Sequence, residues 1–179
     1  MTDKEIRDIF ISDGGQKQAF NIIVREFSQR LYWHLRELVL DHEDADDLLQ
    51  NTFMKAWKAL PNFRWESGLY TWLYRIATNE AFSFLKKERF NNKFSLTPYE
   101  TKLANRITVD PYFSGETIQL LLQKEVAKLP DKQRAIFSMR YFEDMEYSLI
   151  AEILDSNTDA VKASYSLAYK KIEKQLRDI

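Results

Sequence analysis

The chain has 179 residues, enough for one domain or two small ones, and its 45% hydrophobic and 30% charged residues are typical of globular proteins. It has no cysteine, which excludes a disulfide framework and a thiolate metal site, and no apolar run near the roughly 20 residues that span a bilayer. The net charge of −1 argues against a protein that coats DNA unaided, so a nucleic-acid role needs local basic patches or a partner that supplies charge.

Apolar residues at three- and four-residue steps predict amphipathic helices along the first half of the chain. The first predicted helix begins at Gln16, and its apolar face continues to Leu35. A second begins near Asp44, where acidic side chains favour the positive end of a helix, and stops at Pro61. Its predicted core stripe is Leu49, Phe53, Ala56, Trp57 and Leu60. A third helix is predicted over residues 69–90.

The composition changes after the third helix. Residues 93–117 carry Pro, Gly, Ser and Asn without a sustained apolar period, which predicts a flexible linker. Fully extended, such a segment would reach ~80 Å. Apolar periodicity returns at Ile118 and continues to the C-terminus, where Pro130 separates the first two helices. The further predicted helices cover residues 132–142, 147–154 and 158–176. We therefore predict an all-α fold with two small helical domains, residues 1–92 and 118–179.

The last two predicted helices have the spacing of a helix-turn-helix. Ala151 is small enough for the two helices to approach closely. Asp155 occupies the turn position that is usually Gly. Since Asp tolerates the left-handed conformation better than most residues, the turn can still form. The second helix would enter the major groove with its N-terminal residues facing the bases. Its outward-facing residues, predicted to contact DNA, are Thr158, Asp159, Lys162, Ala163, Ser166, Lys170 and Lys171. The alternative is an ordinary helical hairpin.

Residues 62–87, NFRWESGLYTWLYRIATNEAFSFLKK, interleave aromatic and basic side chains. Flat rings on a cationic surface can hold unstacked bases while Lys and Arg neutralise phosphates. Asn79 can offer both a donor and an acceptor to a base edge. Each single aromatic residue could equally belong to the core, where Trp72 could pack on Trp57 or Trp33.

The second predicted helix has a polar face opposite its core stripe. The residues of this face, spaced by three or four, are Asp47, Gln50, Asn51, Met54 and Lys58. A solvated helix face is the alternative explanation. The apolar Met54 within a polar stripe is more typical of a protein interface than of a solvent-exposed surface.

Three segments resemble a known family in their order and spacing. DADDLLQNTFMKAWKAL, the aromatic and basic stretch, and LPDKQRAIFSMRYFEDMEYSLIAEIL resemble the extracytoplasmic-function sigma factors, which are small specificity subunits of bacterial RNA polymerase. The resemblance extends from about Phe20 to Leu176. It implies a transcription initiation factor that binds core RNA polymerase and promoter DNA. It implies no enzymatic activity, cofactor, metal or small-molecule substrate.

The resemblance also implies where the protein acts and what controls it. The charged N-terminus MTDKEIRDIF is unlike a signal peptide, which agrees with a cytoplasmic location. Members of the family are commonly held inactive by an anti-sigma factor, often a membrane-bound one. Such a partner would hold this protein at the inner membrane without insertion of the chain itself.

The same resemblance implies roles for particular residues. The face that includes Asp47 and Gln50 would bind core polymerase, residues 1–92 would bind the minus-ten element, and residues 118–179 the minus-thirty-five element. A pocket for a flipped base would use Ala59, Phe63, Ile76 and Asn79, and would recover part of the few kcal/mol that base flipping costs. The implied minus-ten residues are Ala59, Phe63, Arg64, Trp65, Tyr70, Trp72, Arg75, Ile76, Asn79, Lys86 and Lys87.

Two departures from the family pattern imply a weaker contact with the minus-thirty-five element or one made by other residues. The recognition helix carries Ser166-Leu167-Ala168-Tyr169 where the family usually has a basic run, and Asp155 is atypical in the turn. Two other functional classes are alternatives to a sigma factor, although the near-zero net charge and the aromatic segment argue against the first of them. A stand-alone helix-turn-helix regulator would bind its duplex without polymerase and dimerise on a palindrome. A helical adaptor with no DNA role would tolerate changes at Asn79 and Lys162.

The two histidines, His34 and His42, have no partner at the spacing of metal ligands. We therefore expect them to be packed or surface side chains. The acidic residues between Glu43 and Asp47 are interpreted as a helix start and not as paired catalytic carboxylates. The sequence contains no nucleophile elbow or phosphate-binding loop.

Overall fold

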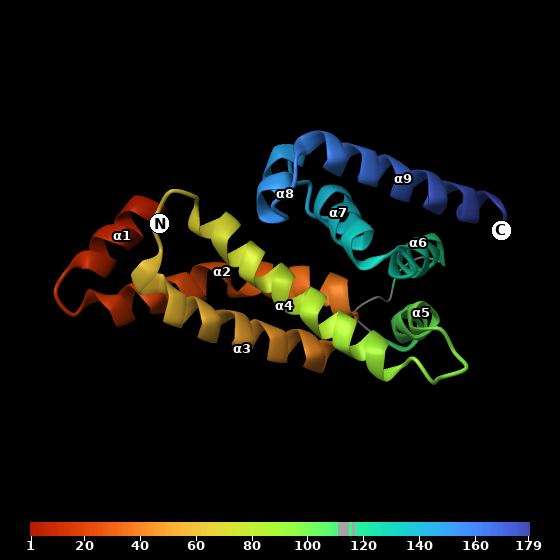
Figure 1. Cartoon of the computed structure of the whole chain (residues 1–179), viewed down its shortest axis with the longest axis horizontal. Coiled ribbons are helices and arrows are strands. Elements are labelled where there is room, and N and C mark those ends of the chain that lie inside the picture. Colours follow the sequence, from red (N-terminus) through yellow and green to blue (C-terminus); the bar gives the residue numbers. More distant parts are fainter. Residues whose placement is uncertain (111–114, 116) are drawn as a thin grey trace.

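The computed structural model describes residues 1–110, 115 and 117–179, and in this part of the chain it contains nine α-helices, one 3-10 helix and no strand. The elements are α1 (Asp3–Ile11), α2 (Gly15–Val39), α3 (His42–Ala59), the 3-10 helix η1 (Leu60–Asn62), α4 (Leu69–Asn91), α5 (Tyr99–Val109), α6 (Thr117–Ala127), α7 (Asp131–Tyr141), α8 (Tyr147–Ile153) and α9 (Thr158–Arg177). Figure 1 shows α2, α3 and α4 side by side, with α7, α8 and α9 along one side of them. The all-α prediction is confirmed.

Local signals in the sequence set several of the helix ends. Asp41 accepts a hydrogen bond from the Asp44 amide at 3.0 Å, so α3 begins two residues before the predicted start. Pro61 lies in the 3-10 helix that follows α3, as expected for a residue that cannot continue an α-helix. Leu40 ends α2 with a left-handed φ of 58°. The long helices therefore follow the predicted boundaries closely.

The prediction of irregular structure throughout the linker is wrong for α5. Its buried residues Tyr99, Leu103, Ala104 and Ile107 repeat at helical spacing, but exposed polar residues between them shorten the apparent stripe. The residues of the predicted linker at 111–114 and 116 lie outside the described part of the chain.

One hydrophobic core joins the two halves of the chain. It contains buried residues of α2 and α4, such as Leu35 and Leu73, together with Ala135 of α7 and Ile150 of α8. A smaller second cluster, which includes Val126 and Ile172, lies within the C-terminal helices. The predicted domains thus pack against each other in this structure through apolar side chains.

Arginine side chains add polar contacts to this packing at the C-terminal end of α2. Arg106 of α5 donates from Nη1 to the carbonyl of Val39 at 3.1 Å, and Arg134 of α7 donates from Nη2 to that of Leu38 at 2.9 Å. Arg36 pairs with Asp110. Terminal carbonyls of a helix lack helical partners and carry partial negative charge, so guanidinium groups are well suited to bind them.

His34 forms a further polar contact between the halves, and is a packed side chain as expected. Its Nδ1 lies 2.9 Å from Glu143 Oε1, and its Nε2 lies 2.8 Å from Thr78 Oγ1. His42 is exposed and lies 2.7 Å from the hydroxyl of Tyr32. In the described residues no three His, Asp or Glu side chains are placed to hold a metal ion.

Candidate nucleic-acid and polymerase interface

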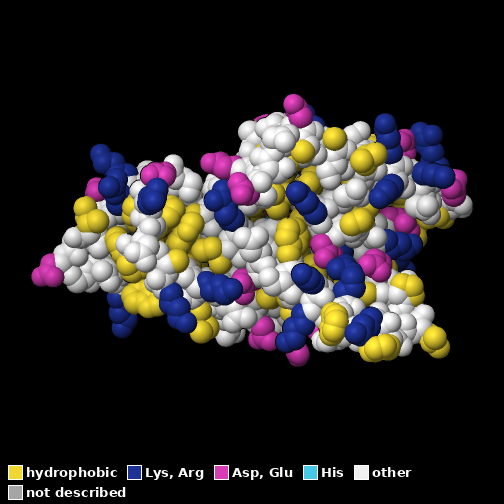
Figure 2. Space-filling model, viewed as in Figure 1, with side chains coloured by type: hydrophobic (Ala, Val, Ile, Leu, Met, Phe, Trp, Pro, Cys, Tyr) yellow, Lys and Arg dark blue, Asp and Glu magenta, His cyan; other side chains and the backbone are white. Residues whose placement is uncertain are grey.

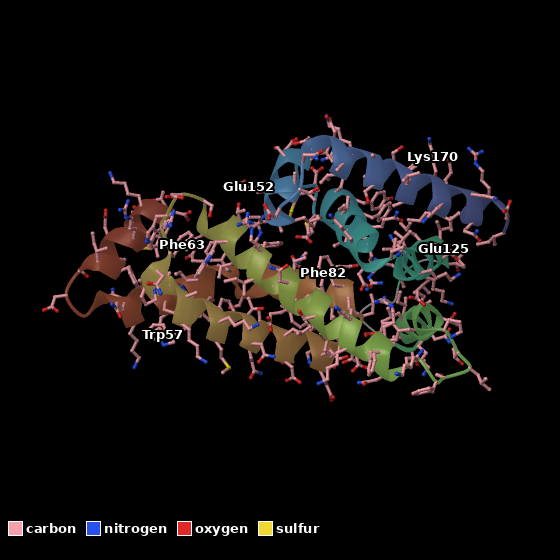
Figure 3. The ribbon with its side chains drawn as sticks, in the orientation of Figure 1. Trp57, Phe63, Phe82, Glu125, Glu152 and Lys170 are labelled. Carbon is pink, nitrogen blue, oxygen red and sulfur yellow. The ribbon has the colours of Figure 1, made fainter. Side chains whose placement is uncertain are left out.

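The predicted minus-ten residues lie on the loop between η1 and α4 and along α4. Phe63 stacks on Trp72 with ring centroids 4.5 Å apart and an interplanar angle of 25°, and its ring centroid lies 5.0 Å from that of Trp65. Trp65 has a left-handed φ of 61°, which turns the loop back toward α4. These three rings form a partly buried cluster, which we call the loop ring cluster. Figure 3 shows Phe63 beside the start of α4.

The polar and basic members of the predicted minus-ten set are mostly accessible. Asn79 is exposed, and Ile76, one turn before it on α4, is partly buried. The other exposed members are Ala59, Arg64, Lys86 and Lys87. An exposed amide beside an apolar side chain and several cations has the chemistry needed to hold a base and its phosphates.

Two members of the predicted set, Tyr70 and Arg75, face the C-terminal helices instead. Tyr70 stacks on Tyr74 at 4.3 Å, and the Tyr74 hydroxyl donates to Glu143 Oε2 at 3.0 Å. Arg75 donates from Nη2 to the backbone carbonyl of Glu152, at 2.6 Å. Burial and the neighbouring Glu143 carboxylate raise the pKa of Tyr74, which keeps its hydroxyl a donor. The structure therefore separates Tyr70 and Arg75 from the loop ring cluster.

The five residues predicted to bind polymerase are all exposed on α3, and the apolar Met54 retains 59% of its accessible surface. Beside them α2 and α3 form a groove of about 540 Å³ with mostly apolar walls. The groove is lined by Lys17, Phe20, Asn21, Val24, Gln50, Phe53, Met54 and Trp57. Trp57, predicted to be core, is 43% exposed in this groove, although Phe20 covers part of it at 5.0 Å between ring centroids.

The helix-turn-helix is formed by α8 and α9. Ile150, Ala151 and Val161 are buried between the two helices, and Asp155 has the left-handed φ of 50° expected for the turn. Asn157 caps α9 by accepting from the Ala160 amide at 2.8 Å.

Most of the predicted minus-thirty-five residues lie open along α9. The exposed members are Asp159, Lys162, Ala163, Ser166, Lys170 and Lys171, whereas Thr158 is partly buried. Figure 3 shows Lys170 on the side of α9 that points away from α7. Lys171 also contacts Gln133 Oε1 at 3.2 Å, so its ammonium group is held close to α7.

Comparison with known proteins identifies the family. Residues 23–91 match Sigma-70 region 2 and residues 119–172 match Sigma-70, region 4, so together the matches cover more than half of the chain. The ECF RNA polymerase sigma-E factor of Haemophilus influenzae is 29% identical over 173 residues, which cover 92% of this chain and 91% of the relative. The chain belongs to the extracytoplasmic-function sigma factors.

Other relatives agree with this assignment. The RNA polymerase sigma-H factor of Pseudomonas aeruginosa is 27% identical over 180 residues, covering 92% of this chain and 90% of the relative. The ECF RNA polymerase sigma factor SigW of Bacillus subtilis is 26% identical, with 92% of each chain covered. The function predicted from the sequence, direction of polymerase to promoters, is confirmed at the level of the family.

Solved structures confirm the fold of the sigma factor. The sigma factor RpoE of Bartonella quintana, in complex with the anti-sigma factor NepR, has a TM-score of 0.70 at 23% identity over 88% of this chain and 96% of that one. CnrH, in complex with the cytosolic domain of CnrY, has a TM-score of 0.66 at 22% identity over 90% of each chain.

Sequence reasoning missed two features of the candidate site in the sigma factor. The α2 wall of the groove between α2 and α3, including Phe20 and Val24, belongs to the apolar face predicted for the first helix, and a helical period alone cannot distinguish a core from an open groove. Helix α1 was also missed, although Thr2 and Glu5 form a capping box that is visible in the sequence. Within the described ranges no helix is long and apolar enough to cross a bilayer.

Proposed function

We propose that this sigma factor binds core RNA polymerase through the exposed face of α3 and reads promoter DNA through two separate surfaces. The minus-ten surface consists of the loop before α4 and the exposed face of α4. The minus-thirty-five surface is the exposed face of α9. Residues 1–92 and 118–179 are the corresponding domains, joined by residues 93–117.

The observations that carry the minus-ten proposal are the loop ring cluster and the exposure of Asn79, which lies farther along α4 than Trp72. The rings of Phe63, Trp65 and Trp72 offer apolar faces, and Asn79 offers a donor and an acceptor on the same helix. Arg64 and the lysines of α4 can neutralise phosphates. This combination is suited to unstacked bases, because stacking needs an accessible ring and base readout needs a polar edge.

The polymerase-binding proposal rests on the exposed apolar surface of α2 and α3. Met54 and Trp57 retain 59% and 43% of their accessible surface, and both line the groove beside Gln50. Burial of two large side chains against a partner would contribute several kcal/mol of binding free energy, at ~25 cal/mol per Å². Asp47 and Lys58 would provide polar contacts at the rim of such an interface.

The minus-thirty-five proposal rests on the orientation of α9. Its N-terminal residues Asp159, Lys162 and Ala163 are exposed, which a helix that enters the major groove requires. Lys170 and Lys171 lie farther along and are proposed to bind phosphates. The family's usual basic run is replaced by residues 166–169, so we propose a smaller phosphate contribution from this helix.

Arg75 links promoter binding to the packing of the two domains. Its hydrogen bond to Glu152 would have to be exchanged for a phosphate contact when α4 binds DNA. Figure 3 places Glu152 on α8, above α4. We propose that polymerase and DNA favour a conformation in which α8 moves away from α4, because a partner stabilises the state that it binds more tightly.

An anti-sigma factor is proposed as the regulatory partner. The two similar solved structures show their sigma-like chains in complex with NepR and with the cytosolic domain of CnrY, respectively. An equivalent partner would cover the α3 groove or hold the two domains together. We further propose a cytoplasmic protein without enzymatic activity, cofactor, small-molecule substrate or membrane insertion, held at the inner membrane where the anti-sigma factor is membrane-bound.

Run-off transcription tests the proposed function. Purified protein is mixed with bacterial core polymerase and promoter-containing DNA from the same source. Specific start sites that depend on the added protein are expected. Binding to polymerase without initiation would favour an adaptor or inhibitor, and tight duplex binding without polymerase would favour a stand-alone regulator.

A further inference from the structure

Helix α1 lies outside both segments that match the sigma families, yet it contacts the start of α4. Asp3 Oδ2 accepts a hydrogen bond from the backbone amide of Leu69 at 2.8 Å, across 66 positions of sequence. Ile6 anchors the helix, because only 1% of its surface is accessible. Figure 1 shows α1 beside the loop that leads into α4.

Asp3 supplies a side-chain hydrogen-bond acceptor that the residues next to the start of α4 lack. The N-cap of α4 is Gly68, which has no side chain to accept a hydrogen bond from the first-turn amides. A carboxylate near the N-terminus of a helix is favoured both as an acceptor and by the helix dipole. A distant residue therefore caps the helix that carries the proposed minus-ten residues.

Phe10 forms a second contact of α1, with the loop that precedes α4. Its ring centroid lies 6.2 Å from that of Trp65, which in turn contacts Phe63, and Phe63 stacks on Trp72. Trp65 holds a left-handed conformation that is unfavourable for a bulky side chain, so it needs support from packing. In Figure 2, hydrophobic side chains gather at this end of the molecule, with Lys and Arg side chains beside them.

We infer that α1 is a positioning element for promoter melting, with Asp3 and Phe10 as its positioning residues. Asp3 fixes the first turn of α4, and Phe10 supports the loop ring cluster through Trp65. Neither residue needs to touch DNA, because each acts by reducing the number of conformations of the loop. This inference rests on the proposed minus-ten role of the loop.

The test uses three variants of α1 and one variant of the loop, Trp65→Ala, in reconstituted holoenzyme. Asp3→Ala removes the cap, whereas Asp3→Asn retains a side-chain acceptor. Asp8→Ala is the matched control, because Asp8 is an exposed carboxylate on the same helix. Promoter melting is followed by the fluorescence of 2-aminopurine in the minus-ten element, and core-polymerase affinity is measured separately on the same preparations.

Asp3→Ala is expected to lower the melting equilibrium about five-fold, the factor that corresponds to loss of a typical N-cap. Asp3→Asn should recover at least half of the melting, and Asp8→Ala should match the parent. The three α1 variants should bind core polymerase within two-fold of the parent. Hydrogen exchange of the Leu69 amide should accelerate only in Asp3→Ala, since that variant alone loses the acceptor.

The inference would be overturned if Asp3→Ala melted the promoter like the parent, or if Asp3→Asn lost as much as Asp3→Ala. Equal losses of melting and of polymerase affinity would also overturn it, because they would indicate general unfolding. Trp65→Ala distinguishes failure of the role inferred for α1 from failure of the proposed minus-ten role of the loop. If Trp65→Ala melts normally, the loop has no minus-ten role. If it is defective while Asp3→Ala is normal, the loop role stands and the role of α1 fails.

Discussion

Arg134 of α7 donates a hydrogen bond from Nη2 to the backbone carbonyl of Leu38, 2.9 Å away in the last turn of α2. Its Nη1 binds the carbonyls of Ala127 and Leu129 at 3.2 and 3.3 Å, and the side chain is fully buried. Burial lowers the pKa of this guanidinium, and nearby Asp131 opposes the shift. One side chain therefore joins the end of α2 to the segment between α6 and α7.

Replacement of Arg134 by Met should destabilise the fold by about 3 kcal/mol, because it keeps apolar volume but leaves several buried carbonyls without their donor. The free energy of unfolding is measured by urea denaturation with tryptophan fluorescence. Lys132→Met is the control, since Lys132 is exposed on the same helix and its loss should change stability by less than about 0.5 kcal/mol. Similar values for the two variants would contradict a stabilising role for the contact between Arg134 and Leu38.

The turn between α8 and α9 offers a substitution that should stabilise the protein. Asp155 has a φ of 50°, where glycine has no steric cost. Asp155→Gly should raise the free energy of unfolding by roughly 0.5–1 kcal/mol, after the entropy of glycine in the unfolded chain is included. Asp159→Gly, inside α9, should lower it by about 1 kcal/mol. A loss of stability in both variants would show that the Asp155 side chain contributes more than its backbone strain costs.

Long amphipathic helices were predictable from the sequence, because α2, α3 and α4 repeat their apolar residues over several turns. The left-handed Asp155 was predictable as well, since the helix-turn-helix spacing fixes which residue takes the turn. In contrast the buried stripe of α5 is short, because it runs only from Tyr99 to Ile107 and exposed polar residues lie between its members. The length of the apolar stripe therefore limits which helices can be predicted from the sequence.

Contacts between distant segments were not predictable. Arg134 binds a backbone carbonyl of Leu38, and every residue has such a carbonyl, so the acceptor leaves no signal in the sequence. The predicted partners of Trp72 were Trp33 or Trp57, whereas the structure stacks it on Phe63. Which ring packs against Trp72 depends on the geometry of the loop, and here on the left-handed conformation of Trp65. No local sequence pattern indicates that conformation.

Asn79 is the sharpest test of minus-ten readout. Because its side chain is exposed on α4, Asn79→Ala should leave the fold and core-polymerase affinity unchanged. Transcription from the cognate promoter should fall about ten-fold, which corresponds to loss of a base contact of 1–3 kcal/mol. Run-off transcription and polymerase co-purification are compared on the same protein. Equal losses in both assays would mean that Asn79 is structural.

For the exposed face of α3 we predict a loss of affinity for core polymerase. Asp47→Ala combined with Gln50→Ala should weaken binding to core polymerase about ten-fold, because both side chains are exposed beside the apolar groove. Affinity is measured by titration of labelled protein with core polymerase. Asp46→Ala, an exposed neighbour outside the predicted face, serves as the control. Unchanged affinity in the double variant would remove this face from the proposed interface.

Two carboxylates line a cavity between the halves of the chain. Glu37 of α2 and Glu143, which follows α7, both border it, and Glu143 also contacts His34 and the hydroxyl of Tyr74. Burial first, and repulsion by Glu143 second, raise the pKa of Glu37 to about 7, while Arg36 and Gln123 act in the opposite direction. In the folded protein the Glu37 carboxyl is therefore mostly protonated only at pH values below about 7.

A raised folded-state pKa gives stability that is present at low pH and lost as pH rises. For Glu37 this contribution is complete below the ordinary value of 4.5 and disappears as pH passes through about 7. Glu37→Gln keeps the shape but cannot ionise, so the free energy of unfolding of the parent should fall relative to the variant by up to about 3 kcal/mol between pH 5 and 8. Urea denaturation of both proteins across this range measures the difference. Parallel pH profiles would show that the Glu37 carboxylate is solvated in the folded state, and that the cavity does not penalise its charge.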